Sequence, residues 1–361
     1  MKNGEVSKIK EKNQYKEINN NKHLSNNKDN DEKLDDIQFL ENIVEDSFSR
    51  YWLDNTFCLF KSINNIIYII YANENKSIIL YHLIKNKKIN EIKNAHNEYI
   101  TNFRYYFDKI CIRDLIISIS CDDNNIKLWN IQNLELLADI KNINKDGYLY
   151  SAYFLTDKNQ NYFITSNCNF EEKPCDLIKI FDFNGNKIKE IENSNDRTYI
   201  IDSYYEKKKD KNYIIAGYCG YVKSYDYSKN KVYHKYDEND NKFHNSIIIN
   251  SREDIVKLIE SSCSGNIVIW NFHSGELLKR IRVSDEWIYG ICMWNIHFLF
   301  VGCKDGIIKL IELNKGKIVK DLIDHNNKVL TIKKINLPKY GQCLISQNCS
   351  NSYLKLWGIK K

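Results

Sequence analysis

Residues 126–129 read Ile-Lys-Leu-Trp, and residues 354–357 read Leu-Lys-Leu-Trp. In both stretches apolar side chains alternate with a lysine, which is the pattern of a β-strand with one buried face. Related strands end at Phe181, Trp270 and Ile311. Because the same strand pattern recurs in distant parts of the chain, the sequence predicts a fold built from repeats.

The recurrence is regular over most of the 361 residues. The strands that carry it end at seven bulky residues, namely Tyr81, Trp129, Phe181, Tyr225, Trp270, Ile311 and Trp357. The gaps between them are 48, 52, 44, 45, 41 and 46 residues. Most of these strands have an apolar run upstream and a further short strand downstream. Short strands at such spacing, with weak helical periodicity, predict an all-β repeat fold of seven units.

Two of the seven units carry a further signature. In the second unit the dipeptide Ala95-His96 precedes the strand pair that ends at Trp129, and in the seventh Asp324-His325 precedes Trp357. Together with the repeat length, this pattern resembles the WD-repeat family. The resemblance covers residues 36–361 and implies a seven-bladed β-propeller with four-stranded antiparallel blades. It also implies that the two histidines are structural, tying a loop to a strand-end aspartate and to the Trp.

The family's turn aspartate lies six residues before the Trp, and the units differ at this position. Asp123 and Asp305 match it in the second and sixth units, whereas Ser264 and Asn351 stand there in the fifth and seventh. Only the second unit therefore combines His, Asp and Trp. We expect the spacing of the strands and their packing to set the architecture, and we expect the family's hydrogen-bond network to be incomplete in most units.

The segment before the first unit differs from the rest. Residues 1–35 are rich in Asn, Lys, Asp and Glu with almost no apolar pattern, so we predict a disordered tail. The propeller then occupies residues 36–361. Since no sequence follows the strand 354–357 to form an outer strand, we predict that Asp36–Val44 supplies it and closes the ring. Closure would remove an exposed sheet edge.

Composition narrows the class of protein. The 53 basic and 47 acidic residues give a net charge of +6 and are interspersed, which is typical of a solvated surface and not of a DNA-binding face. No apolar run is long enough to span a membrane, and the N-terminus lacks the apolar core of a signal peptide. The 11 cysteines show no short paired spacing, so thiols are expected, and with them a cytoplasmic location or, as the alternative, a nuclear one.

Aromatic residues stand where the innermost strand of most blades would begin. The positions are Trp52, Tyr99, Tyr148, Tyr199 and Trp287, in five of the seven units. The fifth and seventh units have Ser246-Ile247 and Lys328-Val329 there instead. In the propeller that the resemblance implies, these positions ring one mouth of the central channel. Because Tyr and Trp are enriched in binding hot spots, we interpret this rim as a candidate partner-binding surface.

Charged residues accompany the aromatic positions, and they are Arg50, Glu98, Arg197, Asp285 and Glu286, with Lys328 in the seventh unit. An aromatic rim with carboxylates could hold a basic or Arg-containing peptide through cation–π and ionic contacts. The alternative is that each aromatic side chain only packs against its own loop. The sequence leaves both interpretations open.

The sequence shows no catalytic pattern, so we expect neither an enzyme nor a cofactor. Gly-x-Ser-x-Gly, phosphate-binding glycine loops and His-Glu-x-x-His are absent, and no other histidine has a partner at metal-ligand spacing. Six cysteines recur near the end of the second strand, namely Cys121, Cys168, Cys219, Cys263, Cys303 and Cys349. Blades spread radially, which would keep these thiols too far apart to share an ion. We therefore interpret them as small packing residues, and we expect no metal.

These features favour a non-catalytic scaffold or adaptor, a monomeric propeller that binds protein or peptide partners within a multiprotein complex. Three alternatives remain. Propellers that bind phosphoinositide carry paired arginines, whereas here Phe103-Arg104 is followed by Tyr105. RNA or acidic lipid could contact the basic run in Glu206–Asn212. A substrate receptor of a ubiquitin ligase would usually carry Trp-Asp-x-Arg, which is absent here. The nearest stretches are Trp129-Asn130-Ile131-Gln132 and Trp270-Asn271-Phe272-His273.

Overall fold

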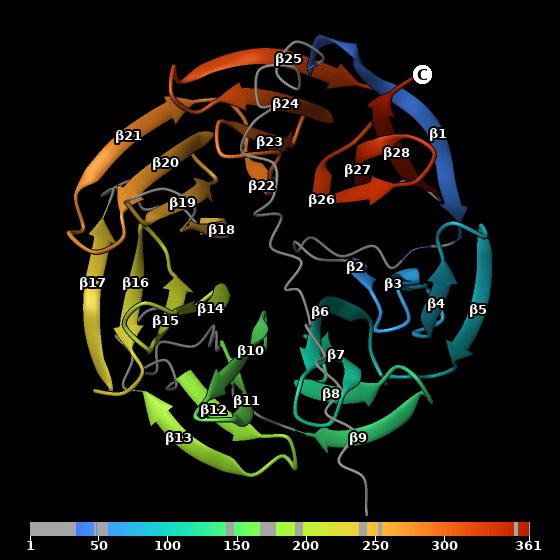
Figure 1. Cartoon of the computed structure of the whole chain (residues 1–361), viewed down its shortest axis with the longest axis vertical. Helices are drawn as coiled ribbons and strands as arrows, with labels where there is room; N and C mark the ends of the chain where they lie inside the picture. The colour runs from blue at the N-terminus through green and yellow to red at the C-terminus, as the bar shows by residue number, and fades with distance from the viewer. Residues whose placement is uncertain are drawn as a thin grey trace, which may run out of the picture.

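The strands of this protein form a ring of separate sheets. The computed structural model describes residues 34–46, 48, 57–141, 148–166, 178–191, 198–237, 244–251, 255–349 and 353–360, without the side chains of 244–246. Within these residues, 28 strands form seven four-stranded antiparallel sheets arranged around a central axis (Figure 1). The expected seven-bladed β-propeller is therefore confirmed. Residues 1–33 of the predicted tail lie outside the described residues.

The first four blades each run from the innermost to the outermost strand in chain order. Blade 1 comprises β2 (Phe57–Lys61), β3 (Ile67–Ala72), β4 (Ile78–His82) and β5 (Lys87–Ile92). Blade 2 comprises β6 (Ile100–Asp108), β7 (Arg113–Ser120), β8 (Asn125–Asn130) and β9 (Glu135–Ile140). Blade 3 comprises β10 (Ala152–Asp157), β11 (Gln160–Thr165), β12 (Ile178–Asp182) and β13 (Lys187–Ile191). Blade 4 comprises β14 (Ile200–Glu206), β15 (Lys211–Gly217), β16 (Tyr221–Asp226) and β17 (Lys231–Asp237).

Blades 5 and 6 follow the same order, and blade 7 combines both ends of the chain. Blade 5 comprises β18 (His244–Asn250), β19 (Lys257–Ser262), β20 (Asn266–Asn271) and β21 (Leu277–Arg282). Blade 6 comprises β22 (Ile288–Met293), β23 (Phe298–Cys303), β24 (Ile307–Glu312) and β25 (Lys317–Ile323). Blade 7 comprises β26 (Val329–Leu337), β27 (Gly341–Asn348), β28 (Tyr353–Ile359) and β1 (Ile37–Glu45), which follows the short 3-10 helix η1 (Leu34–Asp36).

The ring closes through the N-terminal strand. β1 pairs antiparallel with β28, with Ile37 opposite Ile359 and Glu45 opposite Tyr353, and the two strands lie side by side in Figure 1. Ile37 and Val44 are buried. The predicted closure is therefore confirmed, with the strand one residue further along than the predicted segment.

The hydrophobic core is divided among the blade interfaces. Among the described residues, most buried apolar side chains fall into seven clusters, and each cluster lies between two neighbouring blades. Between blades 1 and 2, for example, Ile70 and Ala72 pack with Phe103 and Ile116. Burial on this scale is the main favourable term for the fold. Each blade is therefore held by its neighbours, which makes closure of the ring important for all of them.

Asparagine takes over part of the role of glycine in the turns. Of the twelve non-glycine residues with positive φ in the described part of the chain, six are asparagine, including Asn86 and Asn124. Asparagine tolerates the left-handed region better than most residues because its short polar side chain can bond locally. This explains how an all-β chain folds with only 13 glycines.

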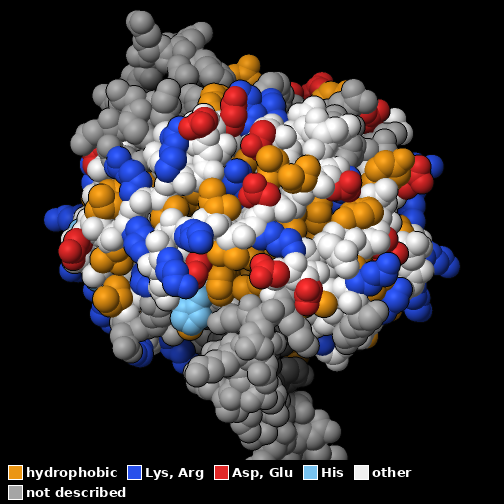
Figure 2. Space-filling view, turned by 90° about the horizontal axis from the view of Figure 1, so that it is seen from above, with side chains coloured by type: hydrophobic (Ala, Val, Ile, Leu, Met, Phe, Trp, Pro, Cys, Tyr) orange, Lys and Arg blue, Asp and Glu red, His pale blue; other side chains and the backbone are white. Residues whose placement is uncertain are grey.

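The outer edge of the ring carries a mixed surface. Figure 2 shows Lys and Arg side chains interspersed with Asp, Glu and hydrophobic side chains on the edge that it faces. Such mixing is typical of a solvated surface. Among the described residues, no helix has the length and hydrophobicity needed to cross a membrane.

Candidate interaction surface at the mouth of the central channel

The predicted rim residues lie at one end of the innermost strands. Tyr99, Tyr199 and Trp287 directly precede β6, β14 and β22, and Lys328 directly precedes β26. Tyr148 lies on the connection to β10. Because each innermost strand starts from the same face of the ring, these residues share that face. Predicted rim residues Arg50, Trp52 and Arg197 lie outside the described residues.

Three of the rim aromatics present a large part of their side chain to solvent. The exposed fraction is 40% for Tyr99, 39% for Tyr148 and 39% for Trp287. The residue that follows each of them, such as Leu149 or Ile288, is buried. Successive side chains of a strand point to opposite sides. Because the residue after each aromatic is buried, the aromatic ring itself points outward.

Two blades share a continuous row of tyrosines on this face. The ring centroids of Tyr148 and Tyr150 are 6.5 Å apart, and those of Tyr150 and Tyr199 are 5.7 Å apart. These separations allow favourable aromatic contact. The row connects the entrance of blade 3 with that of blade 4 and presents an apolar surface with hydroxyl groups, which suits a peptide backbone and side chains.

A lysine pairs with the carboxylate and the aromatic ring at the entrance of blade 2. Lys76, in the turn between β3 and β4, has its Nζ 3.2 Å from the Glu98 carboxylate. The same Nζ lies 5.6 Å from the ring centroid of Tyr99. Lys76 of blade 1 therefore contacts both Glu98 and Tyr99, the rim residues of blade 2.

The entrance of blade 6 repeats this arrangement within a single blade. Lys304, between β23 and β24, pairs with Glu286 at 2.8 Å and lies 5.9 Å from the ring centroid of Trp287. Asp285 pairs with Arg282 at 3.0 Å, although its side chain is fully exposed. Exposed ion pairs contribute at most about 1 kcal/mol, so a bound partner can replace them. The rim carboxylates Glu98, Asp285 and Glu286 are thus already paired with basic side chains, and the rim combines aromatic and charged groups.

Glycine allows a close approach that positions the rim of blade 6. Gly265, in the turn between β19 and β20, has φ +81°. A Cβ at this position would meet the backbone oxygens of Ser284 and Glu286 at 2.1 and 2.9 Å. The Gly265 carbonyl also accepts a hydrogen bond from Val283 N at 3.0 Å. The turn at Gly265 therefore packs closely against residues 283–286, the segment that leads to Trp287.

Two blades contain a buried His–Ser–Trp network. In blade 2, Trp129 Nε1 donates to Ser118 Oγ at 2.8 Å, and His96 Nε2 lies 2.7 Å from the same oxygen. In blade 7, Trp357 Nε1 donates to Ser346 Oγ at 2.7 Å, and the Nε2 of the loop histidine, His325, lies 2.7 Å from it. The serine joins the loop to the Trp strand in both blades.

The predicted turn aspartate takes part in a different way. Asp123 Oδ2 accepts a hydrogen bond from the backbone N of Asn97 at 3.3 Å, so it fixes the residue after His96. Among the described residues, neither Asp123 Oδ1 nor His96 Nδ1 has a hydrogen-bond partner. Asn351, the residue expected at the same place in blade 7, lies outside the described residues.

Burial keeps the two network histidines neutral. It lowers the pKa of His96 to about 3, and Lys127 acts in the same direction. Burial also lowers the pKa of His325 to about 3; Lys355 adds to this effect, and Asp324 opposes it. A neutral imidazole fits the structural role expected for both residues.

Other blades bury different polar groups at the corresponding place. In blade 5, Trp270 Nε1 donates to Glu260 Oε1 at 2.6 Å, and the glutamate is fully buried. In blade 4, the hydroxyls of Tyr218 and Tyr225 are 2.7 Å apart, and both side chains are buried. The bulky residue at the end of this strand therefore has a different buried hydrogen-bond partner from one blade to another.

The cysteine positions agree with a packing role. Cys121, Cys263 and Cys303 are buried, and Cys219 and Cys349 are partly buried, whereas Cys168 lies outside the described residues. Burial raises the pKa of Cys303 to about 12. In the part of the chain that the structure describes, no group of three or more His, Cys, Asp or Glu side chains is placed to hold a metal ion.

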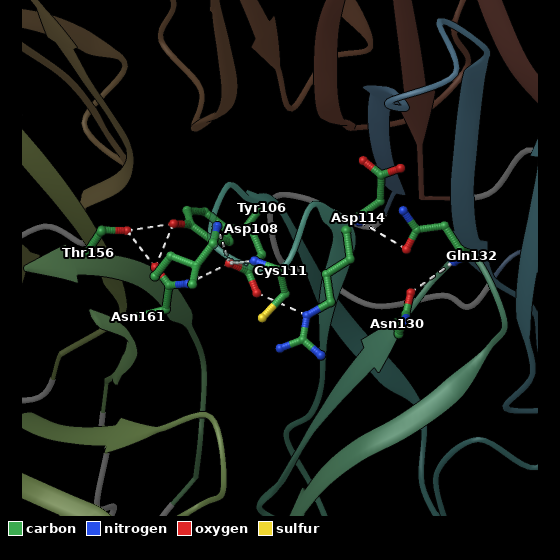
Figure 3. Close-up of polar contacts among 10 residues, drawn as sticks. Tyr106, Asp108, Cys111, Asp114, Asn130, Gln132, Thr156 and Asn161 are labelled. Carbon is green, nitrogen blue, oxygen red and sulfur yellow. Dashed lines mark hydrogen bonds and ion pairs between the residues drawn. The ribbon is translucent and has the colours of Figure 1, made fainter. Parts of the chain in front are cut away.

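On the face opposite the rim, partly buried polar contacts join neighbouring blades. Figure 3 shows Asp108 of blade 2, whose carboxylate accepts from Arg113 Nε and from Asn161 Nδ2 of blade 3, both at 2.9 Å. Tyr106 donates to Asn161 Oδ1 at 2.7 Å. Burial tends to raise the pKa of Asp108, but the Arg113 ion pair and backbone N–H groups outweigh it and lower that pKa. These contacts join blades 2 and 3.

Four side chains that make contacts in the blades or at the rim were not anticipated from the sequence, namely Ser118, Ser346, Tyr150 and Lys76. Ser118 and Ser346 each lie 11 residues before their Trp, and this shared spacing could have revealed them. Tyr150 alternates with Tyr148 along one strand approach, which is visible in the sequence. Lys76 lies 22 residues before its partner Glu98 and in another blade, so no local signal points to that pair.

The fold defines the class of the protein as a seven-bladed β-propeller. No protein-family model matches the chain, and no curated protein gives a significant match. Among the solved structures, 1545 chains match its fold. One is the crystal structure of Raptor from Chaetomium thermophilum, with a TM-score of 0.66 and 13% sequence identity. The match covers 90% of this chain and 29% of the Raptor chain, so this protein spans less than a third of that length, and the likeness concerns the fold.

Proposed function

We propose that this protein is a non-catalytic interaction scaffold, a divergent WD-repeat propeller that binds a protein or peptide partner at the rim of its central channel. The observation that carries the proposal is the repeated exposure of an aromatic side chain at the entrance of blades 2, 3 and 6, at Tyr99, Tyr148 and Trp287. Exposed aromatics on a rigid scaffold are typical anchors of protein interfaces.

Two observations support the proposal that the propeller is of the WD-repeat type. The His–Ser–Trp networks of blades 2 and 7 use the His and Trp on which the resemblance rests. The seven sheets have the strand number that the resemblance implies. The cytoplasmic or nuclear location, the monomeric state and membership of a multiprotein complex stay predictions.

The arrangement of charge refines the expected partner. Glu98 and Glu286 each pair with a lysine that also faces the adjacent aromatic ring. A basic side chain of a partner would have to displace Lys76 or Lys304 to reach them. We therefore expect aromatic and aliphatic side chains of the partner to supply most of the binding energy, with charged side chains setting its orientation.

The alternative functions have weaker support. Arg104 belongs to an innermost strand, β6, and its neighbour Phe103 is buried, so this pair is not on a surface that could meet a membrane lipid. In the basic run 207–209, Lys209 pairs with Glu206 at 3.0 Å, which reduces the charge that RNA or lipid would meet. No contact in the described residues favours a ubiquitin-ligase receptor.

A pair of matched variants tests the proposal. In the first, Tyr99→Ala, Tyr199→Ala and Trp287→Ala are combined to remove the rim aromatics. In the second, exposed apolar residues of the opposite face are changed as a control, with Ile84→Ala, Ile110→Ala and Tyr205→Ala. We expect affinity capture from the native cell to lose its specific partners with the rim variant and to keep them with the control. Equal capture by both variants would contradict the rim as the binding surface.

A further inference from the structure

The face opposite the rim carries exposed lysines on one half of the ring. On this face lie the turns between the first and second strands and between the third and fourth strands of each blade. In blades 1–4, all of these turns are described, and they are residues 62–66, 83–86, 109–112, 131–134, 158–159, 183–186, 207–210 and 227–230. They contain seven exposed lysines, whereas Asp210 is their one acidic residue. We call this surface of blades 1–4 the basic face.

The turns on the side of the rim have the opposite balance of charge. In their described part, only three lysines are exposed. Six acidic residues are exposed there, namely Glu74, Asp122, Asp285, Glu286, Asp305 and Asp324. The mixture of charges along the whole chain therefore conceals a difference between the two faces of the ring. Such a difference gives the molecule an orientation toward a charged surface.

Acidic residues at the strand ends of the basic face are directed into the turns. Asp108 Oδ1 accepts from the backbone N of Ile110 and of Cys111, at 3.0 and 3.3 Å (Figure 3). Asp226 Oδ1 accepts from the backbone N of Lys229 at 3.2 Å. Both carboxylates are buried. The turns therefore use acidic side chains to satisfy their backbone N–H groups, and they leave the lysines at the surface.

Most lysines of the basic face are not paired with a carboxylate. Lys209 pairs with Glu206 at 3.0 Å. The other six form no ion pair with a described residue, and they are Lys85, Lys109, Lys158, Lys207, Lys208 and Lys229. Because these charges are exposed and not compensated by a neighbour, they can attract a negatively charged surface.

Large apolar side chains stand beside these lysines on the same face. The exposed fraction is 54% for Ile84, 55% for Ile110 and 54% for Ile112, and it is 51% for Tyr205 at the end of β14. Ile110 and Ile112 belong to one four-residue turn between β6 and β7. Ile112 has φ +52°, which is rare for a β-branched residue. Backbone held in such a conformation is typical of functional segments, so this apolar turn is a defined feature of the face.

We propose that the basic face docks onto a bilayer that contains acidic lipids, with Ile84, Ile110 and Ile112 in the boundary between headgroups and acyl chains. Charge complementarity supports this partner, because acidic lipids give a bilayer a negative surface potential. Apolar side chains next to basic ones anchor a protein at this depth. RNA would favour aromatic rings on which bases stack, whereas three of the four exposed apolar residues are isoleucine. Docking leaves the rim on the far side accessible, so this proposal does not depend on the function of the rim.

Flotation of the full chain with phosphatidylcholine vesicles, with and without about 30% phosphatidylserine, tests the proposal. We expect binding to the vesicles that contain phosphatidylserine only, and weaker binding at higher salt because ions screen the attraction. Each lysine near an acidic membrane strengthens binding about fivefold, so Lys109→Gln combined with Lys158→Gln should weaken it about tenfold or more. Asp210→Asn removes the one acidic residue of these turns and should strengthen binding about fivefold.

A second variant tests the apolar contribution. It combines Ile110→Ser with Ile112→Asn, because asparagine tolerates the left-handed backbone at position 112. We expect it to bind the acidic vesicles about tenfold more weakly. The matched charge control, Lys93→Gln with Lys141→Gln, removes two exposed lysines from the side of the rim and should bind as the natural sequence does. Circular dichroism verifies folding, and the lysine and Asp210 variants decide the outcome if the apolar variant does not fold.

Four results would overturn the proposal. The natural sequence could fail to bind the acidic vesicles, or the charge control could weaken binding as much as the variant of the basic face. The folded apolar variant could bind as the natural sequence does. Binding of a single-stranded RNA oligonucleotide without binding of vesicles would assign the basic face to nucleic acid instead. The rim variant with Tyr99→Ala, Tyr199→Ala and Trp287→Ala should bind vesicles normally, so failure of the rim proposal and failure of membrane docking are distinguishable.

Discussion

Blades 2 and 5 have the same four strands but hold their central Trp differently. In blade 2 the indole of Trp129 donates to Ser118, which also contacts His96. In blade 5 the indole of Trp270 donates to the buried carboxylate of Glu260. Both Trp side chains are 5% exposed, so the packing is equally complete. The comparison teaches that apolar packing defines the blade, and that the polar partner of the Trp can vary.

Removal of the closing strand should have the largest effect, because it affects every blade, whatever its polar network. Deletion of residues 36–44 removes the buried side chains of Ile37 and Val44 and exposes the edge of β28. Each such side chain contributes about 1.5–3 kcal/mol. We expect the melting temperature to fall by about 10 °C or more, measured by circular dichroism. A chain that lacks only residues 1–30 is the control and should melt normally. An unchanged melting temperature after deletion of 36–44 would contradict closure by β1.

Replacing Trp by Phe compares the two polar networks directly. Trp129→Phe should cost about 1 kcal/mol, since Ser118 keeps its contact with His96. Trp270→Phe should cost about 2–3 kcal/mol, because a buried carboxylate loses a donor. Urea denaturation of both variants measures the free energy of unfolding. Equal losses would show that the polar partner of the Trp has no influence on the stability of its blade.

Acid should weaken the His-containing blades in particular. The folded pKa values of His96 and His325 are about 3, below the ordinary value of 6.5. The unfolded chain therefore binds more protons between these values, so stability is complete above pH 6.5 and is lost progressively as the pH falls toward 3. The double variant His96→Gln, His325→Gln should show a weaker loss over this window in urea denaturation. A pH profile identical to that of the natural sequence would argue against neutral buried histidines.

The rim substitutions should have the smallest effect on stability. Tyr99 and Trp287 are about two-fifths exposed, and surface substitutions usually change stability by less than about 0.5 kcal/mol. We expect the rim variant with Tyr99→Ala, Tyr199→Ala and Trp287→Ala to lose about 1 kcal/mol at most, as measured by urea denaturation. A much larger loss would support the alternative that these rings mainly pack against their own loops.

The sequence was sufficient to predict the architecture because strand patterns are local. The period of the Trp-like positions and the apolar segment 36–44 required no knowledge of distant contacts. The same argument places Tyr99 and Trp287 at strand entrances, since each stands at the start of an apolar run. These inferences depend on order along the chain, which repeats preserve.

Contacts between blades could not be predicted in this way. The pairing of Lys76 with Glu98 depends on how two blades meet. Glu260 takes the place of a serine in blade 5 with a spacing of 10 residues to the Trp instead of 11. Such side chains are chosen by three-dimensional neighbours, so a single sequence carries no periodic signal for them.

Position-specific photo-crosslinking tests the central claim most directly, namely that the rim is where partners bind. A photoreactive phenylalanine derivative would replace Tyr99, Tyr148 or Trp287 on the rim and, as controls, Tyr205 or Ile84 on the opposite face. The account predicts that the rim positions form adducts with a shared partner in the native cell and that the control positions do not. Adducts with that partner from Tyr205 or Ile84 alone would contradict it.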